Sequence, residues 1–120
     1  MTSPGSGDPQ SLLPLTDLTF HVLLALGSGR LHGYAIGKEV ERRSDGRLRP
    51  TTGSLYQALR RLRRDGLIED AREVRFDRGD ARRQYFQLTE LGRQVFALEA
   101  VRLEGLLSAA RAVRLLHDAT

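Results

Sequence analysis

The residues with the clearest chemistry lie at positions 52–65, where polar and basic side chains surround an apolar stripe. The stripe has the i, i+3, i+4, i+7 spacing of an amphipathic helix and consists of Leu55, Ala58, Leu59 and Leu62. The other positions carry Gly53, Ser54, Tyr56, Gln57, Arg60, Arg61, Arg63 and Arg64. Arginine donates paired hydrogen bonds to phosphate or guanine, and glutamine can bond an adenine edge in two places. This face therefore predicts contact with nucleic acid.

Positive charge is concentrated in the middle of the chain. The 120 residues carry 19 basic and 15 acidic side chains, a net charge of +4. Between Arg42 and Arg83 there are 13 arginines and 7 acidic residues, or +6, so the remainder sums to −2. Such a patch indicates a polyanionic partner, either nucleic acid or an anionic membrane surface. The alternative is a solvated basic face balanced by Glu69, Asp70 and Glu73.

Other kinds of chemistry lack their residues. The chain has no cysteine, which excludes disulfides and thiolate metal sites. His21, His32 and His117 lack metal-ligand spacing, and no nucleophile elbow or phosphate-binding loop is present, so we expect no metal, cofactor, catalytic residue or enzyme activity. No stretch approaches the roughly 18 apolar residues of a membrane span. No secretory signal is evident either, and we expect no membrane partner.

Two helices are expected before the basic one. The first begins at its cap Thr16 and is apolar nearly all round, so it must be buried in the core or against a partner. The second covers about residues 33–44, with Tyr34, Ile36 and Val40 on its inner side. Residues 1–13, rich in Ser, Gly and Pro, are expected to form a disordered tail.

A basic hairpin is expected after the basic helix. A strand begins near Leu67, its partner covers residues 84–88, and the segment between them carries Arg72, Arg75, Arg78, Arg82 and Arg83. Helix, turn, basic helix and basic hairpin together predict an α+β, mostly helical fold, a winged helix-turn-helix in residues 14–89. In that fold the basic helix enters the major groove and the wing follows the backbone or the minor groove.

We therefore expect a DNA-binding site on the basic helix and the wing. Ser54 and Gln57 are expected to read bases, Gly53 to let the backbone approach closely, and the arginines to neutralise phosphates. The expected DNA-binding residues are Thr52, Gly53, Ser54, Tyr56, Gln57, Arg60, Arg61, Arg64, Arg82 and Arg83.

A long final helix is expected from Glu90 to about His117, with Thr89 as its cap. Its apolar stripe continues past the point where a small winged helix could cover it, so residues 90–120 are expected to form a C-terminal dimerisation helix. The expected contact residues are Leu98, Leu103, Leu106, Leu107, Ala110 and Val113. The alternative is that this helix folds back on the first helix within one chain.

Four motifs give the chain a resemblance to the PadR family of transcriptional regulators. They are LHGYAI at 31–36, GSLYQALRRL at 53–62, DGLI at 65–68 and RRQYFQLTELG at 82–92. The resemblance covers roughly residues 16–93. It implies a cytoplasmic homodimer that binds inverted repeats in double-stranded DNA, usually as a repressor. It also implies DNA contacts from Gly53, Ser54, Tyr56 and the exposed arginines that follow, and the single C-terminal helix resembles the compact subgroup that dimerises through that helix and the first.

Two departures from the family pattern bear on these expectations. Thr52 stands where many members have proline, a change that a good helix cap should tolerate. The chain has no tryptophan, so stacking of a flat aromatic ligand on tryptophan is not available. A small-molecule effector of unknown identity, between the first and last helices, is left open.

A winged helix that docks on a protein is the main competing interpretation. It would need exposed apolar residues on the basic helix, where Tyr56 is the one candidate. Membrane-surface binding would need an amphipathic helix with its basic residues beside an apolar face for the lipid, and no helix here fits.

Overall fold

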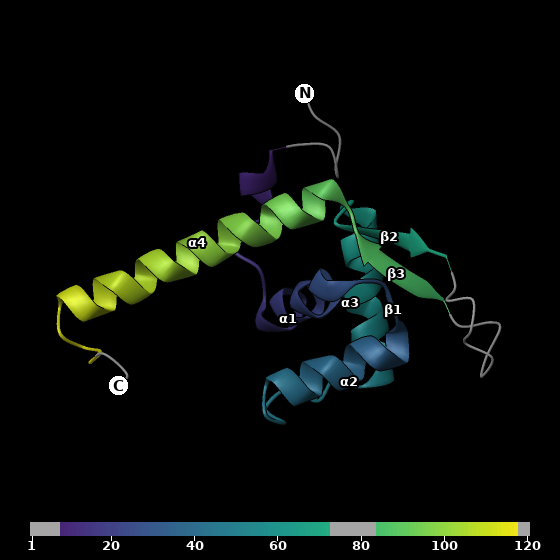
Figure 1. Ribbon diagram of the computed structural model, residues 1–120, viewed down its shortest axis with the longest axis horizontal. Coiled ribbons are helices and arrows are strands. Elements are labelled where there is room, and N and C mark those ends of the chain that lie inside the picture. The colour runs from purple at the N-terminus through teal and green to yellow at the C-terminus, as the bar shows by residue number, and fades with distance from the viewer. Residues whose placement is uncertain (1–7, 73–83, 118–120) are drawn as a thin grey trace.

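The computed structural model describes residues 8–72 and 84–117, whose arrangement is shown in Figure 1. The helices are α1 (Asp17–Ala25), α2 (Gly33–Arg43), α3 (Thr52–Arg64) and α4 (Glu90–Ala112). Short 3-10 helices, η1 (Pro9–Leu12) and η2 (Leu26–Ser28), lie on either side of α1. The helices expected at 33–44 and 52–65 are therefore confirmed to within one residue at each end.

The described strands form an antiparallel sheet in the order β1–β3–β2, with β1 (Leu31–His32), β2 (Ile68–Ala71) and β3 (Tyr85–Leu88). Tyr85 lies opposite His32 on one side and Ala71 on the other. The hairpin strands were expected, but β1 was not. A strand of two residues is too short to show an alternating pattern, and only its pairing with β3 defines it.

Each α-helix begins next to a residue whose side chain caps it. Thr16, Thr51 and Thr89 each accept a hydrogen bond from the backbone N–H three residues further on, and His32 Nδ1 does the same for α2. Gly66, with φ of 80°, ends α3 and turns the chain into β2. These caps fix where α2 and α3 start, and thus which of their side chains face outward.

One apolar core joins the helices to the sheet. Its largest fully buried members include Leu23, Leu26, Ile36, Leu59, Leu67 and Ile68. The stripe expected on α3 is buried, and α1 buries Val22, Leu23 and Ala25. The inward placement of Tyr34 is wrong, because 66% of its surface is exposed. Gly33, Ile36 and Val40 face the core instead, and Tyr34 is turned by about 100° from Gly33.

α4 runs across the body and its C-terminal half extends beyond α1 (Figure 1). η1 and α1 contact this helix, and Leu12 and Leu13 pack on the core. Residues 8–13 thus differ from the expected disordered tail, because their leucines have apolar surface to cover. The end of α4 also differs from the expected His117: Arg114 takes a φ of 64°, and Leu115 N donates to Ala110 O at 2.9 Å.

The structure is an α+β, mostly helical winged helix-turn-helix with a long C-terminal helix. α2 and α3 form the helix-turn-helix, and β2 and β3 are the strands of the wing. Within residues 8–72 and 84–117, no helix is both long enough and apolar enough to cross a membrane.

Candidate nucleic-acid interface

The face of α3 opposite its core stripe is open to solvent. Gly53, Ser54, Gln57, Arg60 and Arg61 are all exposed, as are Thr52 and Arg64. Gln57 and the arginines of α3 line one open depression. The sequence therefore placed these side chains on the correct face, and the helix brings them together.

The arginines of this face differ in how their charge is compensated. Arg63 Nη1 lies 2.7 Å from Asp70 Oδ1, and Arg64 Nε lies 3.5 Å from Asp65 Oδ1. Arg60 and Arg61 make no ion pair with any residue in the described part of the chain. Two guanidinium groups are therefore exposed and uncompensated at the centre of the face, where they can take phosphate oxygens.

The acidic residues near α3, Glu69 and Asp70, form hydrogen bonds with glutamine side chains of the wing. Asp70 accepts a hydrogen bond from Gln84 Nε2 at 2.9 Å as well as from Arg63, and Glu69 accepts one from Gln87 Nε2 at 2.8 Å. Of the three acids named in the alternative of a balanced basic face, Asp70 pairs with Arg63, Glu69 bonds to Gln87, and Glu73 lies outside the described residues.

The N-terminus of α3 is organised by Thr51 rather than Thr52. Thr51 Oγ1 accepts a hydrogen bond from Ser54 N at 3.0 Å, and Ser54 Oγ donates to Thr51 O at 3.1 Å. The hydroxyl of Ser54 is therefore used by the cap and would have to rotate to donate to a base. The amide of Gln57 makes no hydrogen bond within the described residues, which leaves it the freer base-reading group.

Tyr56 lies at the edge of this face and is half-buried. Its ring rests on the backbone of Gly33, and a Cβ built at Gly33 would overlap the phenol oxygen. This side chain, expected to contact DNA, thus also packs α2 against α3. The contact between Tyr56 and Gly33 brings the first sequence motif, at 31–36, against the second, at 53–62.

The wing is described only at its two strands. Arg72 is exposed directly after β2. The remaining expected wing residues, Arg75, Arg78, Arg82 and Arg83, lie outside the described residues, so the expected DNA contacts of Arg82 and Arg83 remain predictions.

Sequence reasoning missed a buried acid on α4. Glu99 is 2% exposed; it accepts hydrogen bonds from Leu15 N at 2.9 Å and from Arg102 Nε at 2.6 Å. The hydrogen bond from Arg102, supported by the backbone N–H of Leu15, holds the Glu99 pKa below its ordinary value, although burial opposes this. Glu99 follows Val95 by four positions and so falls within the apolar stripe of α4. An acid at such a position was the sequence feature that could have predicted its burial.

Beyond Glu99 the same stripe of α4 is uncovered. Leu103, Leu107 and Val113 are exposed, and Leu106 is 56% exposed, whereas Leu98 and Ala110 are partly buried. The spacing of three and four residues that buries Val95 and Glu99 continues through these positions. An apolar surface of this kind on a projecting helix fits a protein partner.

Two of the three histidines, His21 and His32, form hydrogen bonds with backbone groups. His32 Nδ1 accepts the Ala35 N–H at 3.2 Å, and His21 Nδ1 lies 2.9 Å from Asp17 O. In the part of the chain that the structure describes, no group of three or more His, Asp or Glu residues could hold a metal ion.

A family model described as "Transcriptional regulator PadR-like family" matches residues 22–98. The match includes α2, the whole of α3, the sheet and the start of α4. An uncharacterized 37.1 kDa protein in transposon TN4556 of Streptomyces fradiae is 42% identical over 84 residues, which cover 70% of this chain. The aligned part makes up 22% of that protein, so this chain spans less than a quarter of its length.

Solved structures share the fold. A PadR family transcription regulator from Clostridium difficile R20291 superposes with a TM-score of 0.69 at 20% identity, over 82% of this chain and 98% of that one. Bacillus subtilis PadR, solved in complex with operator DNA, superposes with a TM-score of 0.58 at 21% identity. That second match covers 68% of this chain and 45% of the other.

Proposed function

Because the chain belongs to the PadR-like family of transcriptional regulators, we propose that it is a repressor that binds an inverted-repeat operator as a homodimer. DNA-binding regulation of transcription is the function of the family; repression, the inverted repeat and the dimer are specific to the proposal. The function also requires the compartment that holds the DNA, so the proposal includes a cytoplasmic location.

The observation that carries the proposal is the exposed face of α3. Within the described residues, Arg60 and Arg61 have no ion-pair partner and the Gln57 amide, one turn nearer the helix N-terminus, makes no hydrogen bond. In a helix-turn-helix, the N-terminal residues of the second helix lie closest to the base edges. Arginine contacts to phosphate would supply most of the affinity, and Gln57 would supply discrimination between bases.

The uncovered stripe of α4 supports the homodimer. A second copy would cover Leu103, Leu106 and Leu107, which are exposed in the single chain. Most homo-oligomers have closed symmetry, and a two-fold axis presents two copies of α3 in opposite orientations. A two-fold dimer reads an inverted repeat whose half-sites are about one helical turn apart.

Docking of α3 on a protein is less well supported. Among the described residues, the large exposed apolar side chains lie on α2, on α4 or just after α4, and none lies on α3. The feature that the docking interpretation requires is therefore missing from the described face.

Selection of duplexes from a random pool tests the proposal. The purified chain should enrich a motif of two inverted half-sites with centres about 10 base pairs apart, or a multiple of that spacing. Recovery of a single unrepeated half-site would contradict the dimer. Recovery of no enriched sequence would contradict specific regulation. Repression itself is tested by placing the enriched motif over a reporter promoter and measuring whether expression falls when the protein is present.

A further inference from the structure

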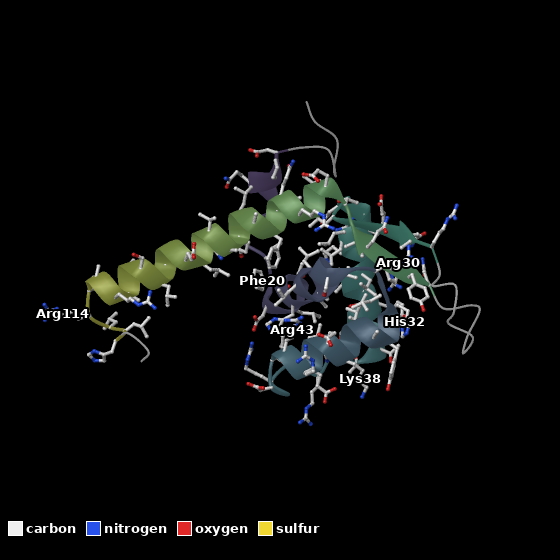
Figure 2. The ribbon with its side chains drawn as sticks, in the orientation of Figure 1. Phe20, Arg30, His32, Lys38, Arg43 and Arg114 are labelled. Atoms are coloured by element: carbon white, nitrogen blue, oxygen red, sulfur yellow. The ribbon has the colours of Figure 1, made fainter. Side chains whose placement is uncertain are left out.

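Tyr34 and Lys38 form an exposed aromatic–cation pair on α2. Lys38 Nζ lies 5.5 Å from the centroid of the Tyr34 ring, which also stacks on His32 at a centroid distance of 6.4 Å. Lys38 extends from α2 away from α1 and α4, and His32 lies at the start of the same helix (Figure 2). A large aromatic ring held in place yet left open to solvent is suited to contact a partner.

The pair adjoins the proposed DNA-binding face. Tyr34 and Lys38 line a cleft of about 320 Å³ whose far wall includes Thr52 and Tyr56 of α3. Arg49 lies on the same cleft, in the turn between the two helices. The surface of the α3 N-terminus thus continues without interruption onto the outer side of α2.

Lys38 brings an uncompensated positive charge to this surface. It is the one lysine of the sequence, and it makes no ion pair within the described residues. The nearby acid of the cleft, Glu41, lies instead 3.8 Å from Arg49 Nε. An ammonium group beside a phenol can donate hydrogen bonds to a phosphate while the ring packs on the adjoining sugar.

We propose that Tyr34 and Lys38 hold the sugar-phosphate backbone of the duplex whose major groove receives α3. This inference rests on the proposed DNA-binding function. The first helix of a helix-turn-helix crosses the DNA backbone while the second lies in the groove, which matches the position of the pair on α2. A backbone contact carries no sequence information itself, but it fixes the register in which Gln57 meets the bases.

The test compares salt-dependent binding of charge variants. Fluorescence anisotropy would follow two labelled duplexes, one taken from the DNA upstream of the protein's own coding sequence and one scrambled. Lys38→Gln should weaken binding to both by the same factor. It should also make the slope of log K against log salt shallower by about 0.9 for each bound protomer. Lys38→Arg should restore the slope, and Tyr34→Leu should weaken binding to both duplexes with the thermal midpoint unchanged.

Arg43→Gln provides the matched control. Arg43 lies on α2 five positions after Lys38, about 140° around the helix, and pairs with Glu39 at 3.0 Å. Its removal should leave the slope unchanged. An unchanged slope in Lys38→Gln would overturn the inference and leave the pair for an acidic protein partner, while the proposed function would survive. An equal decrease of the slope in Arg43→Gln would also overturn the inference, because the change would then reflect net charge and not a contact made by Lys38. Failure of the unaltered protein to bind either duplex would reject both proposals.

Discussion

Gly92 on the first turn of α4 lies directly against the backbone carbonyl of Leu67, so that any side chain at position 92 would overlap the carbonyl oxygen. The same oxygen accepts a hydrogen bond from Thr89 N at 3.1 Å, and Thr89 Oγ1 donates to Gly66 O at 2.6 Å. These contacts join the start of α4 to the turn that ends α3. They therefore fix the direction in which α4 leaves the DNA-binding unit.

Gly92→Ala should destabilise the protein by about 3 kcal/mol or prevent folding, because a backbone carbonyl cannot move aside as a side-chain end can. The matched control is Gly105→Ala on the same helix, where an added Cβ meets nothing within 4 Å. That change should raise stability by about 0.5–1 kcal/mol, because alanine favours helix over glycine. Urea denaturation measures both, and equal midpoints would contradict the close approach of Gly92.

Two substitutions on α3 should have different effects on DNA binding. Arg61→Ala should weaken binding to all sequences alike, because it removes a phosphate contact. Gln57→Ala should instead reduce discrimination at one or two base pairs, each worth about 1–3 kcal/mol. Affinities for a set of single-base operator variants separate the two. If Gln57→Ala leaves the sequence preference unchanged, the orientation assigned to α3 in the groove is wrong.

Leu106→Glu should give a monomer that binds DNA poorly. Leu106 is on the uncovered stripe of α4, and a buried carboxylate at a dimer interface would have no partner. Val101→Glu is the matched control, since Val101 is 64% exposed but lies about 140° around the helix from Leu106. Sedimentation velocity at micromolar concentration would measure both. A dimer surviving in Leu106→Glu, or lost equally in Val101→Glu, would reject the proposed interface.

Glu99 should make stability depend on pH at the acid end. The pKa of its carboxyl in the folded chain lies below the ordinary 4.5, chiefly through Arg102. The charged form therefore stabilises the fold above pH 4.5, and this contribution is lost as the pH falls through the lowered value. Glu99→Gln should lower the free energy of unfolding by about 1–3 kcal/mol at neutral pH. The variant should also lose less stability than the unaltered protein as the pH falls. Glu104→Gln, on the exposed part of α4, should follow the unaltered protein in urea titrations at each pH.

The helix-turn-helix was predictable because its signals are local. The stripe from Leu55 to Leu62 has helical spacing, and the caps and terminating glycines lie beside it in sequence. These features fix which side chains of α3 face outward, so the exposure of Gln57, Arg60 and Arg61 followed from spacing alone.

The remaining features depend on contacts between distant segments. β1 exists through pairing with β3, some fifty residues later. Glu99 is buried because Leu15, 84 positions earlier, brings its N–H to the carboxylate. Tyr34 could have been placed correctly from the spacing of Gly33, Ile36 and Val40, which leaves no room for it on the inner side.

Binding of the purified protein to its own upstream DNA and to a scrambled duplex, at increasing salt concentration, tests the central claim most directly. An electrophoretic mobility assay should show two protomers on the native duplex, at salt that removes the protein from the scrambled one. Equal affinity for both duplexes at every salt concentration would contradict sequence-specific regulation and leave a general polyanion binder.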